Sequence, residues 1–234
     1  EPRPMRAERT AATLLCALLV GASTVAGCVD DAPDGLLGNR FEEIIELPPP
    51  DLDGDMTLEQ ALEQRRSQRD YAPAPLSIAT IGQLLWAGQG VTGDRGYRTA
   101  PSAGARYPLE LYAVTATDVL HYLADGHRVE RRSDTTALAD LGDAAFGQEY
   151  VATAPVVFVV VGVPARTAAE YGDLAAGFVE REVGHATQNM LLQATALGLA
   201  AVPVGGVDPE RVARLLAVPP GHEVYYLVPV GRPA

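Results

Sequence analysis

Five consecutive residues, Arg65-Arg66-Ser67-Gln68-Arg69, place three guanidinium groups and a hydroxyl close together in the chain. Arg65 and Arg69 are four residues apart and therefore share one face of a helix. Because guanidinium groups bind phosphate oxygens bidentately, this spacing suits a phosphate ligand. Arginines at the end of a helix can also simply offset the negative end of the helix dipole. The motif alone leaves both interpretations open.

Two loops made of small residues could approach a planar ligand closely. The first contains Pro101, Ser102, Ala103 and Gly104, and the second contains Val204, Gly205 and Gly206 just before a predicted helix start at Asp208-Pro209. Small side chains let backbone N–H groups come near a ligand, and an N–H at a helix start favours electron-rich atoms. The alternative is that each loop only connects two elements.

Composition and charge exclude several classes of function. All 18 basic residues are arginine, so chemistry that needs a lysine, such as a P-loop or a Schiff base, is excluded. The net charge of −12 disfavours nucleic acid as a partner. The four histidines lack the spacing of a metal site, and the Gly-x-Ser-x-Gly elbow of serine hydrolases is missing.

The first thirty residues have the pattern of an export signal. Arg6 and Arg9 precede an uncharged stretch, residues 10–29, that contains Val25-Ala26-Gly27-Cys28. This resembles a bacterial lipoprotein signal, which implies cleavage before Cys28, lipid attachment to Cys28 and a membrane-anchored protein on the extracytoplasmic face. An uncleaved transmembrane anchor is the alternative. We therefore expect a signal peptide at 1–27, an acidic, proline-rich tether at 28–55 and one domain at 56–234.

The hydrophobic pattern of the remaining chain predicts one α+β domain. Apolar spacing and capping residues indicate helices, and β-branched runs with an Asp125-Gly126 turn indicate strands. We expect helices at 57–66, 77–89, 136–146, 168–199 and from 208, and strands at 109–117, 119–123, 127–131, 156–163, 200–204 and 223–231. The apolar positions of the 168–199 helix, with Gly184 and Gly198, exceed what one small sheet can cover, which predicts a homodimer through this helix.

Taken in order, these motifs resemble the nitroreductase family of flavin mononucleotide (FMN) enzymes, and most closely the SagB-type dehydrogenase branch. The resemblance covers residues 57–233. Its motifs are 65–69, 101–112, Gly184-His185-Ala186-Thr187-Gln188-Asn189, 203–208 and Pro229-Val230-Gly231-Arg232-Pro233.

The resemblance implies a mixed sheet flanked by helices, in a homodimer with FMN at its interface. Arg65, Ser67, Arg69 and Arg232 would hold the phosphate and ribityl chain, with Arg66 as a further contact. Pro101, Ser102, Ala103 and Gly104 would line the pyrimidine side of the ring, Val204, Gly205 and Gly206 would lie near its N5 edge, and Gln148 would touch the ring.

The implied activity is the transfer of two electrons between a donor, such as NAD(P)H, and a small-molecule or peptide substrate. The resemblance points to no particular catalytic side chain. Azoline oxidases of the SagB branch are associated with a Lys-Tyr pair, which a chain without lysine cannot contain. Two alternatives stay open: a lipid-anchored binding module on the same fold, which keeps flavin or an empty pocket without turnover, and an inert structural lipoprotein. The clustering of arginines at one helix end disfavours the inert protein.

Overall fold

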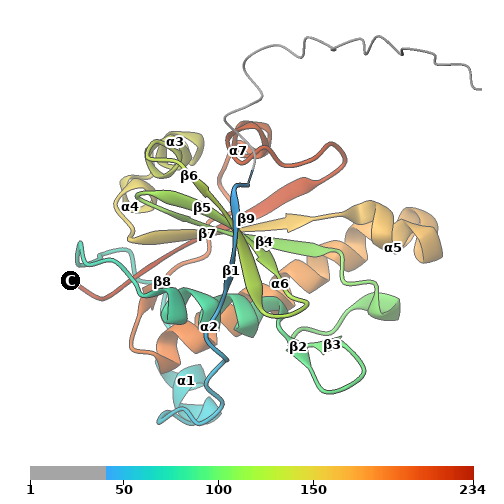
Figure 1. The fold of residues 1–234 in the computed structure, drawn as a ribbon, viewed down its shortest axis with the longest axis horizontal. Helices are drawn as coiled ribbons and strands as arrows, with labels where there is room; N and C mark the ends of the chain where they lie inside the picture. The colour runs from blue at the N-terminus through green and yellow to red at the C-terminus, as the bar shows by residue number, and fades with distance from the viewer. Residues whose placement is uncertain (1–40) are drawn as a thin grey trace, which may run out of the picture. The chain divides into compact units, whose positions relative to one another are not determined.

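The computed structural model describes residues 41–234, which form a seven-stranded sheet flanked by helices (Figure 1). The strand order is β1-β6-β5-β4-β7-β9-β8, and every neighbouring pair of strands is antiparallel. The strands are β1 (Glu43–Glu46), β4 (Leu109–Thr115), β5 (Asp118–Leu123), β6 (Arg128–Ser133), β7 (Val156–Gly162), β8 (Ala200–Ala201) and β9 (Glu223–Gly231), with a separate hairpin of β2 (Val91–Thr92) and β3 (Tyr97–Arg98).

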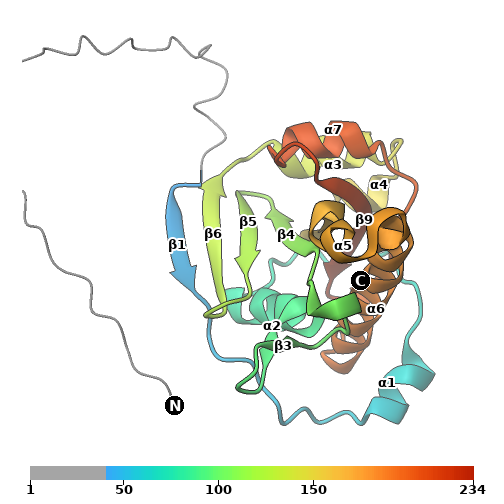
Figure 2. The same ribbon diagram turned by 90° about the vertical axis from the view of Figure 1, so that its right-hand side faces the viewer.

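The helices cover both faces of the sheet (Figure 2). Residues of α2 (Ile78–Gln89) and α6 (Ala175–Ala196) pack on one face, and residues of α3 (Ala137–Ala144), α4 (Glu149–Ala152) and α7 (Pro209–Leu215) pack on the other. Two further helices, α1 (Leu58–Gln64) and α5 (Pro164–Tyr171), contact α6. The predicted α+β class and the helix-flanked sheet are confirmed.

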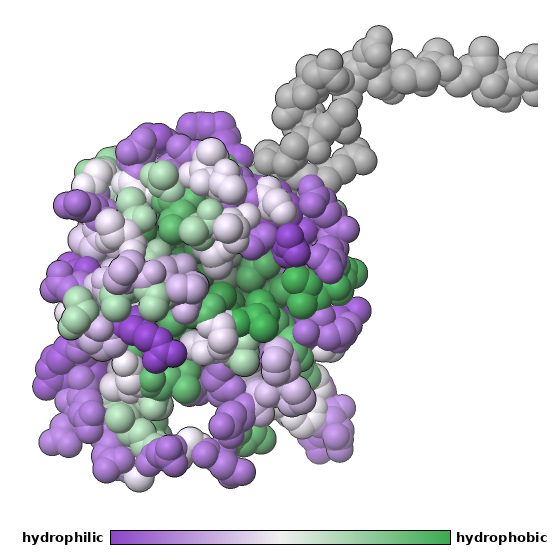
Figure 3. Space-filling model, turned by 60° about the vertical axis from the view of Figure 1, so that its left-hand side comes forward, coloured by the Kyte–Doolittle hydropathy of each residue, from purple (hydrophilic) through white to green (hydrophobic). Residues whose placement is uncertain are grey.

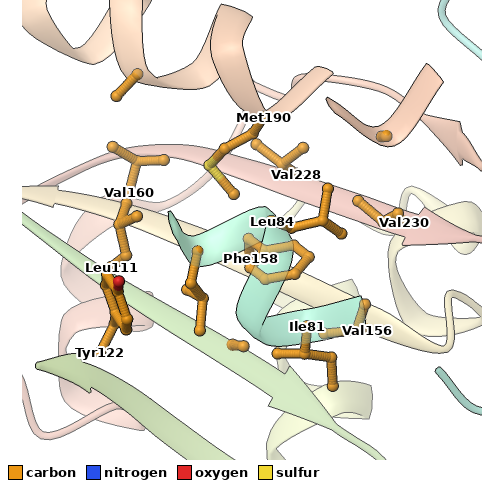
Figure 4. Close-up of a cluster of buried hydrophobic side chains, with 14 of the residues drawn as sticks. Ile81, Leu84, Leu111, Tyr122, Val156, Phe158, Val160, Met190, Val228 and Val230 are labelled. Carbon is orange, nitrogen blue, oxygen red and sulfur yellow. The ribbon is translucent and has the colours of Figure 1, made fainter. Parts of the chain in front are cut away.

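Strand β7 is the centre of the core. Its side chains alternate between the two faces: Phe158 joins the cluster beneath α2 and α6 (Figure 4), while Val159 joins the cluster beneath α3 and α7. All seven residues of β7 are buried. The run predicted at 156–163 is therefore a strand buried on both faces, as its β-branched composition indicates.

Local signals in the sequence mark several boundaries correctly. Helix α1 begins with a capping box, in which the Thr57 hydroxyl accepts from the Gln60 N–H at 3.2 Å and the Gln60 side chain accepts from the Thr57 N–H at 2.9 Å. Ser77 caps α2 and Asp208 caps α7 through their side chains. Gly126 has φ +85° in the turn that joins β5 to β6.

The tether predicted at 28–55 is wrong for the residues that form β1. Glu43 to Glu46 pair with Arg131 to Arg128 of β6, which makes β1 an edge strand of the main sheet. Leu47 is buried in the core next to it, and Asp51 hydrogen-bonds to Gln83 of α2 at 2.8 Å. Edge strands and extended tethers are both rich in charged residues. The acidic sequence of β1, which pairs with an arginine-rich strand, therefore resembles that of a tether.

The single helix predicted at 168–199 is two helices. Helix α5 ends at Tyr171, and a 3₁₀ turn at Gly172–Leu174 precedes α6. Gly172 has φ +52° and cannot continue an α-helix in that conformation. The break lies where apolar spacing continues, so periodicity alone does not show it.

The apolar face of α6 is covered within the chain. Val183, Ala186, Met190 and Ala194 are buried in the core cluster with the sheet and α2, whereas Gly184 is exposed. Most of the apolar face predicted for 168–199 is therefore covered within the chain, while Leu174 and Leu197 stay exposed. The homodimer remains a prediction.

Large hydrophobic side chains also reach the surface in several places, for example Leu58 and Leu62 of α1 and Leu197 after α6. Figure 3 shows hydrophobic residues between hydrophilic ones on one face of the molecule. Residues 41–234 contain no helix long and apolar enough to cross a membrane. The predicted signal and the lipidation site Cys28 lie outside the described residues.

Candidate functional site

The arginine motif begins where α1 ends at Gln64, so the prediction that Arg65 and Arg69 share one face of a helix is wrong. The motif runs along the edge of the main sheet instead. The Gln68 N–H donates to the Ala201 carbonyl at 3.0 Å, and Ser67 forms a parallel bridge with Ala201 of β8. A few residues on, the Ala72 N–H donates to the Arg232 carbonyl at 2.9 Å. These backbone bonds bring the motif beside Arg232, which is distant in sequence but was predicted to bind the same phosphate.

Tyr71 holds this segment against β9. Its hydroxyl lies 3.1 Å from the Gln68 carbonyl and 3.3 Å from the Pro229 carbonyl. Burial raises the pKa of Tyr71 above its ordinary value, so the hydroxyl stays protonated and able to donate. The segment that carries the arginines is thus fixed by both backbone and side-chain bonds.

The arginines of the motif divide into two roles. Arg66 donates from Nη1 to the carbonyls of Glu63 and Arg65, each at 2.8 Å, and so caps the C-terminal end of α1. Among the described residues, Arg65, Arg69 and Arg232 form no ion pair with a carboxylate. The helix-end interpretation therefore applies to Arg66, and the other guanidinium groups are available to an anion.

A second group of residues connects the arginine motif to the Gly205-Gly206 loop. The Arg69 guanidinium lies over the ring of Tyr150, 5.5 Å from its centroid, and the Tyr150 hydroxyl donates to the Gln148 side chain. The Gln148 amide donates in turn to the carbonyls of Ala145, at 2.8 Å, and Gly206, at 2.9 Å. The structure thus brings Arg69, Gln148 and Gly206, all predicted site residues, to one edge of the molecule.

These bonds restrict what Gln148 can do. Both hydrogens of its amide are used by backbone carbonyls, and its oxygen accepts from Tyr150. Gln148 therefore holds the Gly206 backbone in this structure. Only the second lone pair of its side-chain oxygen is free to accept a hydrogen bond from a ligand.

The 203–208 loop exposes its glycines beside β9. Val204 pairs with Leu227 through two backbone hydrogen bonds of 2.8 and 3.0 Å, and it is buried. Gly205 and Gly206 follow it at the surface. A Cβ at Gly205 would lie 3.1 Å from the Tyr226 ring, so glycine permits the close passage of this backbone.

The 101–104 loop lies elsewhere, against α5 and the first half of α6. A Cβ at Gly104 would lie 2.6 Å from the Glu170 carboxylate, and Arg106 forms an ion pair with Glu170 at 2.7 Å. Ser102 accepts from the Tyr107 N–H at 2.8 Å and contacts the carboxyl of Glu182. Pro101, Ala103 and Gly104 are partly or fully exposed.

Within one chain, this loop is distant from the arginine motif. Ser102 lies beside Glu182 of α6, whereas Ser67 lies beside Ala201, beyond the C-terminal end of that helix at Ala196. The helix rises about 1.5 Å per residue, so Glu182 and Ala196 are about 20 Å apart along its axis. Figure 1 shows α5 and β8 on opposite sides of the molecule.

Two residues near the predicted site belong to none of the sequence motifs, and the sequence analysis did not predict them. Tyr150 joins Arg69 to Gln148, and Glu182 is a carboxyl that is only 3% exposed. Burial raises the pKa of Glu182 to about 7, against a lowering contribution from the Ser102 hydroxyl. Within residues 41–234 the Glu182 Oε1 atom has no hydrogen-bond partner. Glu182 could have been found from the sequence, because it is a glutamate on an otherwise apolar face of a predicted helix.

The described part of the chain contains no group of three or more His, Cys, Asp or Glu side chains placed to hold a metal ion. His121 lies between two carboxylates instead. Its ring nitrogens are 2.9 Å from Glu110 and 3.1 Å from Glu130. The two carboxylates raise the pKa of His121 against the opposing effect of burial. This is a charged network within the sheet.

Comparisons with known proteins agree with this architecture. The sequence model of the Nitroreductase family matches residues 62–232. A protein of Methanocaldococcus jannaschii, named as a candidate nitroreductase, is 37% identical over 197 residues, which is 81% of this chain and 98% of that protein.

Solved structures show the same fold. A candidate nitroreductase from Ralstonia eutropha has a TM-score of 0.74 and 28% identity, over 82% of this chain and 90% of that chain. The NADPH:FMN oxidoreductase from Vibrio harveyi, solved with NAD+, has a TM-score of 0.58 and 21% identity, over 75% of this chain and 68% of that chain. With the family model spanning most of the chain, the chain belongs to the Nitroreductase family of oxidoreductases.

Proposed function

We propose that the protein is an FMN-dependent oxidoreductase of the SagB-type dehydrogenase branch that transfers two electrons between a donor and a small-molecule or peptide substrate. The observation that carries the proposal is the arrangement at the sheet edge. Backbone bonds from Gln68 and Ala72 bring the arginine motif to Arg232, and Arg69 reaches Gly206 through Tyr150 and Gln148. The arginines suit the phosphate end of FMN and the glycine loop suits its ring end.

The residues present fit the cofactor. Arg65, Arg69 and Arg232 supply guanidinium groups without carboxylate partners in the described structure, as a phosphate dianion needs. Gly205 and Gly206 supply an exposed backbone, where a side chain at Gly205 would press on Tyr226. When bound, FMN supplies the two-electron chemistry, and the protein supplies orientation and electrostatics.

Each part of the chain then has a definite task. Arg65, Ser67, Arg69 and Arg232 would hold the phosphate, and the backbone N–H groups of Gly205 and Gly206 would lie near the N5 edge of the ring. Gln148 keeps the Gly206 backbone in place through its 2.9 Å hydrogen bond.

The complete site is proposed to need two copies of the chain. The 101–104 loop, which the family resemblance places on the pyrimidine side of the ring, lies near Glu182 and Glu170, away from the arginine motif of its own chain. A second copy could bring its loop to the first copy's arginines. Leu58, Leu62 and Leu197 are exposed around α1 and the end of α6, where a partner would cover them.

The donor and the location of the enzyme are part of the same proposal. The likeness in fold to the NADPH:FMN oxidoreductase solved with NAD+ supports NAD(P)H as a donor. Azoline oxidation is disfavoured because the 234 residues contain no lysine. The sequence pattern up to Cys28 supports export and anchoring by a lipid on the extracytoplasmic face.

An absorbance spectrum of the purified protein tests the proposal. Co-purified or added FMN should give the flavin bands, and the bound flavin should bleach on photoreduction and recover when an electron acceptor is added. Bound flavin that is not reoxidised by any acceptor would favour a non-catalytic flavin-binding module. A chain that does not bind FMN at all would contradict the proposal.

A further inference from the structure

A cavity of about 470 Å³ lies away from the arginine motif, between the end of α2, β3, the start of β4 and the β5–β6 turn. Four arginines line it, against two carboxylates, Glu110 and Asp125. Such an excess of guanidinium groups is unusual in a chain with 18 basic and 30 acidic residues. The arginines are Arg98, Arg106, Arg128 and Arg166.

Two of the four arginines are already paired. Arg106 binds Glu170 at 2.7 Å, and Arg166 donates to the Glu110 carboxylate and to the Tyr107 carbonyl. His121 also contacts Glu110, at 2.9 Å, and the pKa of Glu110 is lowered by His121 and Arg166 against the effect of burial. The charges on this side of the cavity are therefore balanced.

Arg98 and Arg128 are not balanced in the same way. Arg98 is 3.9 Å from the carboxylate of Asp125, and Arg128 is 3.9 Å from the carboxylate of Glu46. These distances are too long for hydrogen bonds. Both carboxylates are largely exposed, at 92% and 74%, so water competes for them.

Buried donors at the cavity also lack partners. Within the described structure, the Nε atoms of Arg98 and Arg128 are buried and form no hydrogen bond, and the same holds for both the nitrogen and the oxygen of the Gln89 amide. Gln89 is only 1% exposed and lines the cavity. Buried polar groups are rarely left unsatisfied in native proteins, so several of them around one cavity indicate a ligand.

The two unbalanced arginines converge on one place. The Nη2 atom of Arg98 approaches the Asp125 carboxylate, and the Nη2 atom of Arg128 lies 3.5 Å from the Asp125 carbonyl. Arg98 also donates to the Gln89 backbone carbonyl at 3.2 Å. Gln89, Arg98 and Arg128 all line the same cavity.

The rest of the wall is apolar. Leu109, Leu111, Leu123 and Ala124 line the cavity together with the rings of Tyr107 and Tyr122. We propose that this cavity binds a small organic carboxylate, whose carboxylate accepts from Arg98 and Arg128 beside the Gln89 amide and whose apolar body packs on the leucines. None of the lining residues is one of the residues proposed to bind the flavin, although Arg106 and Tyr107 directly follow the 101–104 loop.

The test is a titration of the ¹⁵N-labelled full chain with hexanoate, followed by NMR. The readout is the side-chain amide signal of Gln89, identified by its loss in Gln89→Met. Hexanoate should shift this signal saturably, and the neutral isostere hexanamide should bind about tenfold or more weakly, because it cannot form charge-assisted bonds.

Variants then assign the binding to the two arginines. Arg98→Gln and Arg128→Gln should each weaken hexanoate binding about tenfold and leave hexanamide unchanged. Arg95→Gln is the matched control, since Arg95 is exposed in the adjacent β2–β3 turn and does not line the cavity. If Arg98→Gln does not fold, Arg128→Gln carries the test.

Inorganic phosphate checks the apolar part of the proposal, because it cannot use the leucine wall. Phosphate should bind more weakly than hexanoate, and equal binding would overturn the proposal in favour of a general anion site. An unshifted Gln89 signal, or variants that bind like the wild type, would also overturn it. FMN binding by Arg128→Gln should be normal, so the result here stands apart from the proposed flavin site.

Discussion

The side-chain amide of Gln148 donates a hydrogen bond to the backbone carbonyl of Gly206 at 2.9 Å, across 58 residues of sequence. The Gln148 oxygen accepts from Tyr150, whose ring lies beneath the Arg69 guanidinium. This chain of contacts joins the segment proposed to bind phosphate to the loop proposed to bind the flavin ring. A substitution at Arg69 or at Gly206 can therefore alter both the proposed phosphate site and the proposed ring site.

Replacing Arg69 by alanine should weaken FMN binding but not riboflavin binding. Loss of one charge-assisted contact to the phosphate costs roughly 1.5–3 kcal/mol, or about ten- to a hundredfold in affinity. Riboflavin has no phosphate and loses nothing. Fluorescence titration of both flavins measures the two affinities.

Arg66→Ala is the control for this experiment. Its Nη1 atom is bonded to the Glu63 and Arg65 carbonyls at the end of α1. The variant should lose a few tenths of a kcal/mol to about 1 kcal/mol in stability, because it loses a helix-end interaction, and should bind both flavins normally. Equal weakening of both flavins by Arg69→Ala would contradict the phosphate assignment.

A mixture of two defective variants should recover flavin binding if the site is shared between two copies. The first variant is Arg65→Ala with Arg69→Ala, and the second is Ala103→Trp, which blocks the 101–104 loop. Each hybrid dimer then has one site with intact arginines from one copy and an intact loop from the other. After random exchange, about a quarter of all sites should be restored.

The controls for the mixture are the two variants measured separately and light scattering of the wild type. Neither variant should bind FMN well alone, and the wild type should have twice the mass of its sequence. A mixture that binds no more than its components, or a monomer that binds FMN fully, would show that one chain forms the complete site.

Glu182→Gln should remove a decline in stability with rising pH. Burial raises the pKa of Glu182 to about 7 from its ordinary value of 4.5, so the folded state holds a proton that the unfolded state has released between these values. The stability of the wild type therefore falls as pH rises through this window. The slope is at most about 1.4 kcal/mol per pH unit, or roughly 3 kcal/mol in all.

Urea unfolding at pH 4.5 and pH 8 measures this effect. Relative to the wild type, the free energy of unfolding of Glu182→Gln should be higher at pH 8 than at pH 4.5. Glu180→Gln, an exposed neighbour on the same helix, should follow the wild type at both values. A wild type and a Glu182→Gln variant with parallel pH profiles would mean that Glu182 does not titrate in this range.

Cys28→Ala should abolish membrane partition of the expressed full chain if Cys28 is lipidated. A lipid attached to the cysteine is then the anchor, and its loss leaves a domain without one. Detergent-phase partition of the two proteins measures the effect. Unchanged partition of the variant would favour an uncleaved spanning segment.

Local patterns in the sequence were sufficient for much of the fold. The apolar run at β7, the capping box at Thr57, the turn at Gly126 and the caps at Ser77 and Asp208 all depend on residues within a few positions of one another. Such signals report burial and hydrogen bonding that are decided locally. The order of the motifs along the chain likewise identified the family without any tertiary information.

Tertiary structure alone decided which distant segments meet. The sequence shows that residues 43–46 are charged at both ends. They form a strand only because their backbone pairs with the otherwise unpaired edge of β6. The sequence shows three arginines in one motif, but only the chain's course past Ala201 and Arg232 separates Arg66, which caps its helix, from Arg65 and Arg69. It suggests two loops for one ring, but α6 keeps the 101–104 loop away from the arginines. The physical reason is that propensity and periodicity act within one element, whereas strand pairing and helix packing depend on which edges and faces the whole chain leaves free.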